Sequence, residues 1–220
     1  EVPPGYTVAT TGVLNSKTTE GGMVDWHFQA ENVIDFAWFT SPAFRHEKYT
    51  GVVAGQNKVD LNVYYDPRDS VLWSKAGVYA ARALEFYSDW LGAYPYQQMS
   101  VVCAPLSAGG GMEYPMVAQI GYMEDSASLD LVIAHEIGHT WLYGILANNE
   151  RAHPWMDEGL NSFIETQYTA KYQPAYREAY LPREYTTRAS MDQVDALQHA
   201  LHFSNTLQPP ATSPESQQQA

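Results

Sequence analysis

Hydrophobic and polar residues alternate along the first third of the chain, with the two-residue period that is typical of half-buried β-strands. The clearest case surrounds Trp26 and Phe28, whose neighbours are polar. Runs rich in β-branched or aromatic residues predict further strands, and paired glycines at 21–22 predict a turn. Asp66-Pro67 ends this strand-rich portion. The predicted strands lie at 6–13, 26–30, 33–40 and 59–65.

After residue 70 the period changes to that of amphipathic helices. A long helix is predicted from Ser70, a suitable N-cap, to Leu91, because Gly92 is a suitable stop. A short apolar strand, a Gly-rich loop and another strand follow, at 99–104, 109–115 and 117–121. The remaining predictions are helices at 129–146 and 154–172, a helical region to about residue 203, and an irregular tail from residue 209.

The composition permits a folded core and narrows the possible partners. Hydrophobic residues make up 45% of the 220 positions, so global disorder is excluded. The 25 acidic and 12 basic residues give a net charge of −13, and we expect no nucleic-acid binding because such a surface repels phosphates. The most apolar stretch, 129–146, contains four polar or charged residues, so no membrane span is predicted. These are Asp130, His135, Glu136 and His139.

The stretch His135-Glu136-Ile137-Gly138-His139 carries the main chemical signal. Residues four apart on a helix lie on one face, so both imidazoles can reach one metal ion. Glu136 can hydrogen-bond a water on that metal without being a ligand itself. Imidazole and carboxylate ligands favour zinc, and a catalytic zinc site needs a third protein ligand.

Glu158 is the expected third ligand. It follows His139 by 19 residues, enough chain for one helix to end, a loop to turn and a second helix to begin at Pro154. Glu165 lies two helical turns further on and is a candidate to orient a ligating imidazole. The alternative for Glu165 is an exposed carboxylate on the helix surface.

The Gly-rich loop supplies a candidate substrate contact. Consecutive glycines allow the backbone to approach a ligand closely, and Gly111 and Met112 lead directly into Glu113. A carboxylate in a water-poor cleft beside zinc would attract a cation such as a free α-amine. The alternative is an ordinary loop acid.

The sequence resembles the M1 family of zinc aminopeptidases, the gluzincins. The shared motifs are HExxH, a Glu-Gly pair at the start of a helix 18 intervening residues after the second histidine, and Trp141. The loop also matches the family's Gly-x-Met-Glu-Asn, except that Tyr114 replaces Asn. The resemblance implies an α+β fold, in which a strand-rich N-terminal portion precedes a thermolysin-like, mainly helical zinc-peptidase domain. The implied domains are the C-terminal part of a β-domain at 1–66 and a catalytic domain at 67–220, truncated at its C-terminal end.

The resemblance also implies roles for individual residues. His135, His139 and Glu158 match the ligands of one zinc ion, Glu136 matches the general base, and Glu113 matches the residue that holds the free N-terminus of a peptide substrate. The implied function is hydrolysis of the N-terminal peptide bond by a metal-activated water. Two alternatives stay open: a non-catalytic interaction module of metallopeptidase fold, and a hydrolase of a non-peptide substrate.

One family feature has no match in this chain. The family's oxyanion-stabilising tyrosine is expected near or beyond Ala220, where this sequence has none. We therefore expect further domains to be missing, and we expect these 220 residues to bind zinc but to hydrolyse peptides weakly.

Overall fold

A five-stranded mixed sheet supports the helices that carry the candidate site. The computed structural model describes residues 1–107 and 109–176. The sheet has the order β5-β6-β7-β9-β8, in which β6 and β7, and also β7 and β9, run parallel. All six residues of β7 are buried, as expected for a central strand covered on both faces. The strands are β5 (Arg45–Ala54), β6 (Asn57–Tyr65), β7 (Gln98–Cys103), β8 (Gly111–Met112) and β9 (Val117–Ile120).

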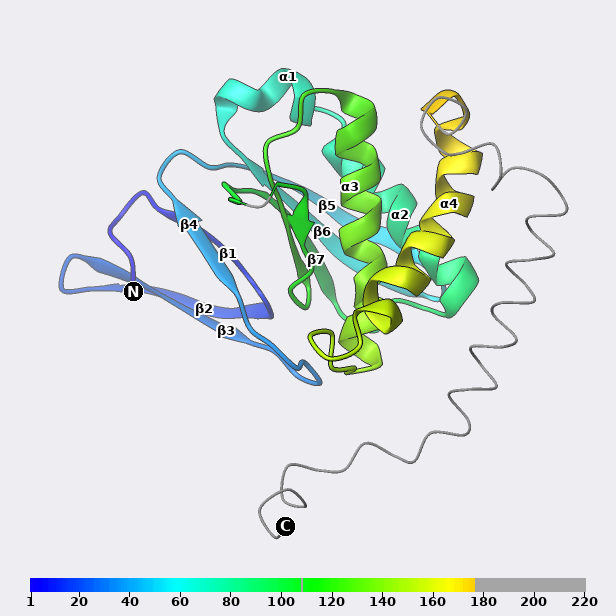
Figure 1. Cartoon of the computed structure of the whole chain (residues 1–220). Helices are drawn as coiled ribbons and strands as arrows, with labels where there is room; N and C mark the ends of the chain where they lie inside the picture. The colour runs from blue at the N-terminus through cyan, green and yellow to red at the C-terminus, as the bar shows by residue number, and fades with distance from the viewer. Residues whose placement is uncertain (108, 177–220) are drawn as a thin grey trace, which may run out of the picture. The chain divides into compact units, whose positions relative to one another are not determined.

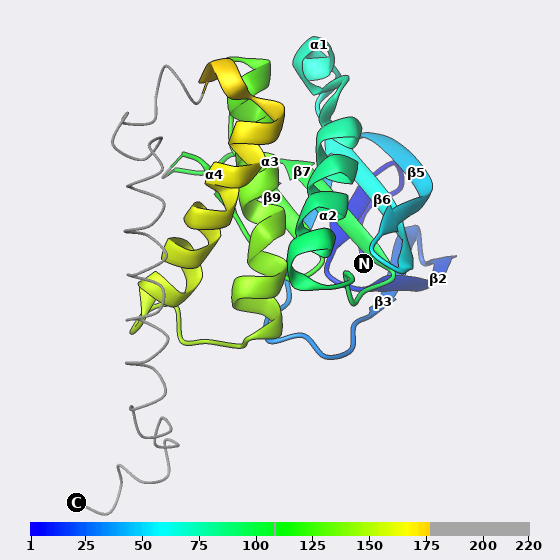
Figure 2. The same ribbon diagram turned by 90° about the vertical axis from the view of Figure 1, so that its right-hand side faces the viewer.

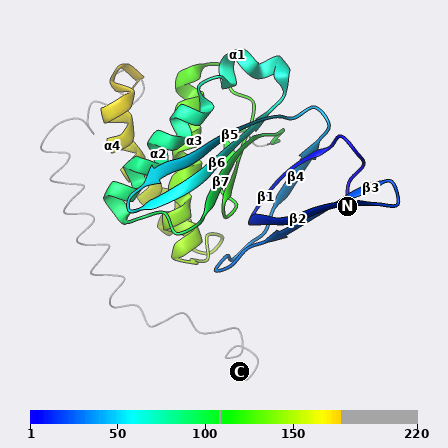
Figure 3. The same cartoon turned by 180° about the vertical axis from the view of Figure 1, so that it is seen from behind.

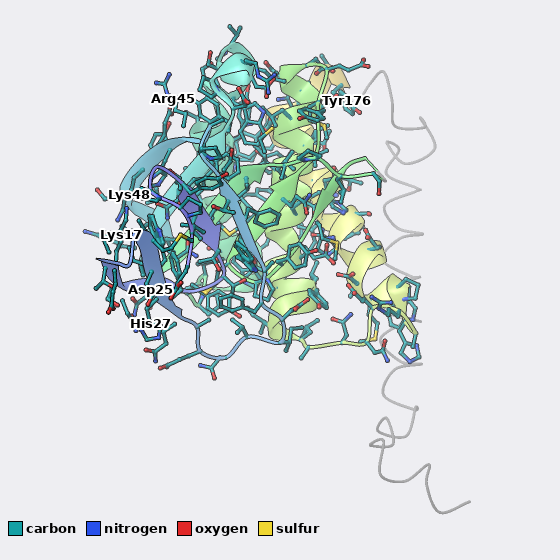
Figure 4. The ribbon with its side chains drawn as sticks, turned by 90° about the vertical axis from the view of Figure 1, so that its left-hand side faces the viewer. Lys17, Asp25, His27, Arg45, Lys48 and Tyr176 are labelled. Carbon is teal, nitrogen blue, oxygen red and sulfur yellow. The ribbon has the colours of Figure 1, made fainter. Side chains whose placement is uncertain are left out.

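Four further strands form two antiparallel pairs, β1 with β4 and β2 with β3, on the side of the sheet away from the helices (Figures 1 and 3). Gly12 separates β1 from β2 with a φ of 99°, and a Cβ there would lie 2.6 Å from the Gln29 carbonyl oxygen, so the turn requires glycine. Figure 4 shows Lys17, Asp25 and His27 on the β2–β3 hairpin. The strands are β1 (Thr7–Thr10), β2 (Val13–Glu20), β3 (Met23–Gln29) and β4 (Trp38–Ser41).

The helices cover the opposite face of the five-stranded sheet (Figure 2). Helix α2 packs on β5 and β6, α3 packs on α2 and β9, and α4 packs on α3. The core between these layers contains side chains that are at most 1% exposed, among them Leu61, Val101, Leu84, Ile133 and Ile137. The helices are α1 (Ser70–Trp73), α2 (Ala76–Leu91), α3 (Ser126–His139) and α4 (Leu160–Tyr172). Each helix in the described part of the chain is too short or too polar to cross a membrane.

The predicted fold class, α+β with a strand-rich portion before a mainly helical one, is confirmed. Strands β5 and β6 share a sheet with β7 across residue 66, and the domain boundary between 66 and 67 stays a prediction. The helical region expected to residue 203 and the tail from 209 lie outside the described residues.

Several predicted elements differ in their bounds. The strand expected at 33–40 begins only at Trp38, because the backbone of Ala37 bonds instead to the hydroxyls of Thr10 and Thr11. The helix expected at 70–91 is broken between Trp73 and Ala76, and this break lets both of those side chains be buried. Ser70 is the first residue of α1, not its cap.

The helix expected at 129–146 begins earlier and changes form at its end. It starts at Ser126 because the Asp125 carboxylate accepts hydrogen bonds from the backbone N–H groups of Ala127 and Ser128. After His139 the chain continues as a π-helix, Thr140–Ile145. Trp141 anchors this segment by donating its indole N–H to the Gly92 carbonyl at the end of α2.

The cap of α3 generates a first prediction. Asp125→Ala should lower the free energy of unfolding by about 1 kcal/mol, because two backbone donors lose their acceptor. The hydrogen bond from the Ser128 backbone lowers the pKa of Asp125. The stabilisation is therefore present above the ordinary Asp pKa and is lost as the pH falls through the lowered one. Urea denaturation at several pH values measures both effects.

Glu124→Ala is the matched control, since it removes the neighbouring exposed carboxylate outside the cap. An Asp125→Ala variant as stable as the control at neutral pH would contradict this account of where α3 begins.

Candidate active site

The two histidines of the HExxH motif meet on one face of α3, as a spacing of four residues dictates. The Nε2 atoms of His135 and His139 lie 3.1 Å apart. His139 is 1% exposed, whereas the side chain of His135 is 21% exposed. The pair is therefore reached by solvent on the His135 side, while His139 is buried beneath it.

Glu158 reaches this pair from the segment before α4. It lies in a short π-helical turn, Trp155–Gly159, which directly precedes α4. Its Oε2 is 3.2 Å from His135 Nε2 and 3.8 Å from His139 Nε2. These separations bracket the edge of about 3.3–3.4 Å expected for a tetrahedron with zinc–nitrogen bonds of about 2.0–2.1 Å.

Each imidazole is oriented by a second carboxylate. Glu165 Oε2 lies 3.0 Å from His135 Nδ1, and Asp157 Oδ1 lies 2.5 Å from His139 Nδ1. A carboxylate accepts, so each Nδ1 donates, and a neutral ring then has its lone pair on Nε2. Two such lone pairs at 3.1 Å repel, so the rings either share a proton, which His135 Nε2 then donates to His139 Nε2, or bind a metal ion together. The donor set therefore fits a metal ion.

Asp157 is a site residue that the sequence analysis missed. It is 3% exposed and precedes Glu158. Its position next to a predicted ligand was the one available signal, because a single acid in a helical turn has no periodic pattern of its own.

The electrostatics of the site reflect burial among acids. Burial alone would lower the pKa of His135, but the hydrogen bond and charge of Glu165 outweigh it and raise the pKa to about 9. Burial raises the pKa of Glu136 to about 8, although the charge of His135 opposes this. Both shifts favour the protonated forms of His135 and Glu136, and nearby carboxylates contribute to each of them.

Glu136 is placed for proton transfer. It is 6% exposed, and its Oε2 has no hydrogen-bond partner among the described residues. Gly111 of β8 lies directly against this carboxylate, since a Cβ at 111 would be 2.5 Å from Glu136 Oε1. The glycine thus allows the loop backbone to approach the acid closely.

Glu113 follows β8, where Met112 pairs with Gln119 of β9. Its carboxylate belongs to a second cluster, with His139 and Asp157, whose oxygen and nitrogen atoms lie within 4.8 Å of one another. Burial raises the pKa of Glu113 to about 7, against the charge of His139. The structure thus brings Glu113, Glu158 and Glu165 to the histidines near the C-terminal end of α3.

Comparisons with known proteins find similar sequences and similar folds. The model of the peptidase family M1 domain matches residues 78–215. The chain is 31% identical over 87 residues to a Xenopus laevis protein named leukotriene A-4 hydrolase, covering 38% of this chain and 14% of that protein. It is 23% identical over 176 residues to aminopeptidase M1-C of Oryza sativa subsp. japonica, covering 74% and 20%.

Solved structures share the fold. The M1 zinc metallopeptidase from Deinococcus radiodurans superposes with a TM-score of 0.61 at 20% identity, over 77% of this chain and 39% of that one. A variant of a two-domain M1 zinc metallopeptidase bound to L-arginine gives the same values. The chain thus spans less than half the length of these proteins.

The orienting bond to His135 generates a second prediction. In chain stripped of metal, Glu165→Gln should lower the pKa of His135 from about 9 toward or below 6.5, because burial then dominates. A raised histidine pKa stabilises the folded state below about pH 6.5, and this contribution is lost as the pH rises through about 9. The variant should therefore lose less stability than wild type across that range.

NMR titration of the His135 ring and urea unfolding at several pH values measure these changes. Glu85→Gln removes an equal charge from the exposed face of α2 and should leave both unchanged. If the pKa of His135 is the same in Glu165→Gln as in wild type, Glu165 does not set the state of this ring.

Proposed function

The chain belongs to peptidase family M1, and from that premise we propose that it forms the catalytic centre of a zinc-dependent aminopeptidase, which removes the N-terminal residue of peptides. The observation that carries the proposal is the convergence of His135 Nε2, His139 Nε2 and Glu158 Oε2, all within 4.8 Å of one another. Two imidazoles and one carboxylate form a donor set that suits catalytic zinc.

His135, His139 and Glu158 would hold the zinc ion. When bound, zinc polarises the scissile carbonyl and lowers the pKa of its water to about 7. Glu165 and Asp157 hold the two rings in the orientation that directs Nε2 toward the ion.

Glu136 acts as the general base. Its buried Oε2, which has no partner among the described residues, is free to accept a proton from the attacking water. The same oxygen later delivers that proton to the amine that leaves. The raised pKa of about 8 suits both transfers, because a base works best when its pKa lies near the working pH.

Glu113 selects the chain end. Its carboxylate would pair with the α-ammonium group of the substrate, with Gly111 and Met112 lining the approach. A peptide without a free N-terminus would leave this half-buried charge unpaired. The enzyme would thereby measure one residue from the N-terminus.

Two other functions remain in view. A non-catalytic module would have little reason to keep the base together with the three ligands. The similarity to a protein named leukotriene A-4 hydrolase is the reason to consider hydrolysis of a non-peptide substrate as the other alternative. The chain covers 14% and 20% of the two curated relatives. The activity and further domains of the whole protein are therefore proposals, as is the weak activity expected of these 220 residues.

Metal analysis gives the third prediction. The purified chain should hold about one zinc per molecule, and His135→Ala should remove it. Glu136→Gln should keep the metal, because this residue is not a ligand, but lower the rate of aminoacyl-amide hydrolysis about 10²–10⁴-fold.

His27→Ala is the control for zinc content, since His27 is exposed on β3 (Figure 4). A folded wild-type chain that holds no zinc in zinc-containing buffer would contradict the proposal.

Recognition of the free amine gives the fourth prediction, and its readout needs no turnover. Leucine hydroxamate should bind the zinc-loaded chain about tenfold or more tightly than its N-acetyl form, because only the free amine can pair with Glu113. Glu113→Gln should remove most of this difference in calorimetric titrations, whereas Glu85→Gln should preserve it. Equal binding of both forms to wild type would favour one of the two other functions.

A further inference from the structure

Asn161 connects the helix that carries Glu165 to the backbone of the first histidine. It lies in the first turn of α4, three residues after Glu158, and its side chain is fully buried. Its Nδ2 donates a 2.8 Å hydrogen bond to the carbonyl oxygen of His135. This bond joins α4 directly to the backbone of α3 at a predicted ligand, in addition to the bond between Glu165 and the His135 ring.

Gly138 makes this close approach possible. A Cβ at 138 would lie 2.1 Å from Asn161 Oδ1 and 2.5 Å from Cζ of Tyr87 on α2. Any larger residue would push α4 or α2 away from α3. The glycine inside the HExxH motif therefore serves as the point where three helices meet, with the amide of Asn161 wedged against it.

This contact is not arranged for stability alone. Asn161 Oδ1 and the hydroxyl of Tyr87 are both buried without a hydrogen-bond partner among the described residues. Unpaired buried polar atoms cost stability, and an apolar side chain of similar size would avoid that cost. A polar residue here is explained by what its other atom does, which is to fix the His135 carbonyl.

We propose that Asn161 is a positioning residue for the metal centre: through its bond to the His135 carbonyl it holds α4 against α3 at the spacing where Glu158 and Glu165 both reach the His135 ring. This inference rests on the proposed zinc site. It assigns to Asn161 an action on metal binding that is separate from its share in holding the fold.

Another side-chain bond between α3 and α4 allows the effect of Asn161 on metal binding to be tested apart from its effect on the fold. The Tyr168 hydroxyl donates to Asp130 Oδ1 over 2.7 Å, and both residues are fully buried. Asp130 lies five residues before His135, more than one turn from the ligand pair. Tyr168→Phe therefore removes this buried bond between the same two helices, together with the bond that the hydroxyl accepts from Arg82 Nε of α2, without touching the ligand end.

The experiment compares Asn161→Ala with Tyr168→Phe in the 220-residue chain. Zinc affinity is measured by competition with a chromophoric chelator, the visible absorption of the Co²⁺-loaded form reports ligand geometry, and urea unfolding of the metal-free chain reports stability. Asn161→Ser, whose hydroxyl is too short to keep the bond, is read in the same way if the alanine variant does not fold.

We expect the Asn161 variants to lose zinc affinity tenfold or more and to change the Co²⁺ spectrum, in line with the effect of removing outer-sphere support. Tyr168→Phe should lose stability but keep zinc affinity within about twofold, because its bond lies away from the ligands. Asn161 variants with wild-type affinity and spectrum, or equal losses in Tyr168→Phe, would overturn the inference. A wild-type chain that binds no zinc would overturn the proposed function as well.

Discussion

Two imidazole nitrogens held 3.1 Å apart constrain everything around them. Each ring donates its Nδ1–H to a carboxylate, so the facing Nε2 atoms can share a proton or bind one metal ion together. The surrounding acids add to this demand, because the charges of Glu113 and Glu158 act with burial to raise the pKa of Glu136. A divalent ion resolves both problems at once, by accepting the lone pairs and offsetting the negative charge.

The fold supplies the rigidity that such a repulsive arrangement needs. Helix α3 packs on α2, above a sheet whose central strand β7 is fully buried. Trp141, in the π-helix that continues α3, donates a hydrogen bond to the end of α2. Strand β8 carries Gly111 against Glu136, so the Gly-rich loop is in direct contact with this acid. The carboxylates on either side of Glu158, at 157 and 165, tie the second helical segment to the first.

Short-range spacing made much of this site predictable. Positions four apart on a helix placed both histidines, and a count of residues after His139 placed Glu158 on the next helical segment. The orienting bond of Asp157, the break between α1 and α2 and the contact of Asn161 with Gly138 were not predictable in this way. Each depends on which side chain packs against another helix, and hydrophobic periodicity reports only which face is buried.

The location of the metal is the most direct test of this account, because the part of the chain that the structure describes offers two groups of candidate ligands that share His139. Crystals of the zinc-loaded protein, measured on both sides of the zinc absorption edge, give an anomalous difference map that locates the ion. The account predicts one strong peak between His135 Nε2, His139 Nε2 and Glu158 Oε2. A peak between Glu113, His139 Nδ1 and Asp157, or none at either group, would contradict it.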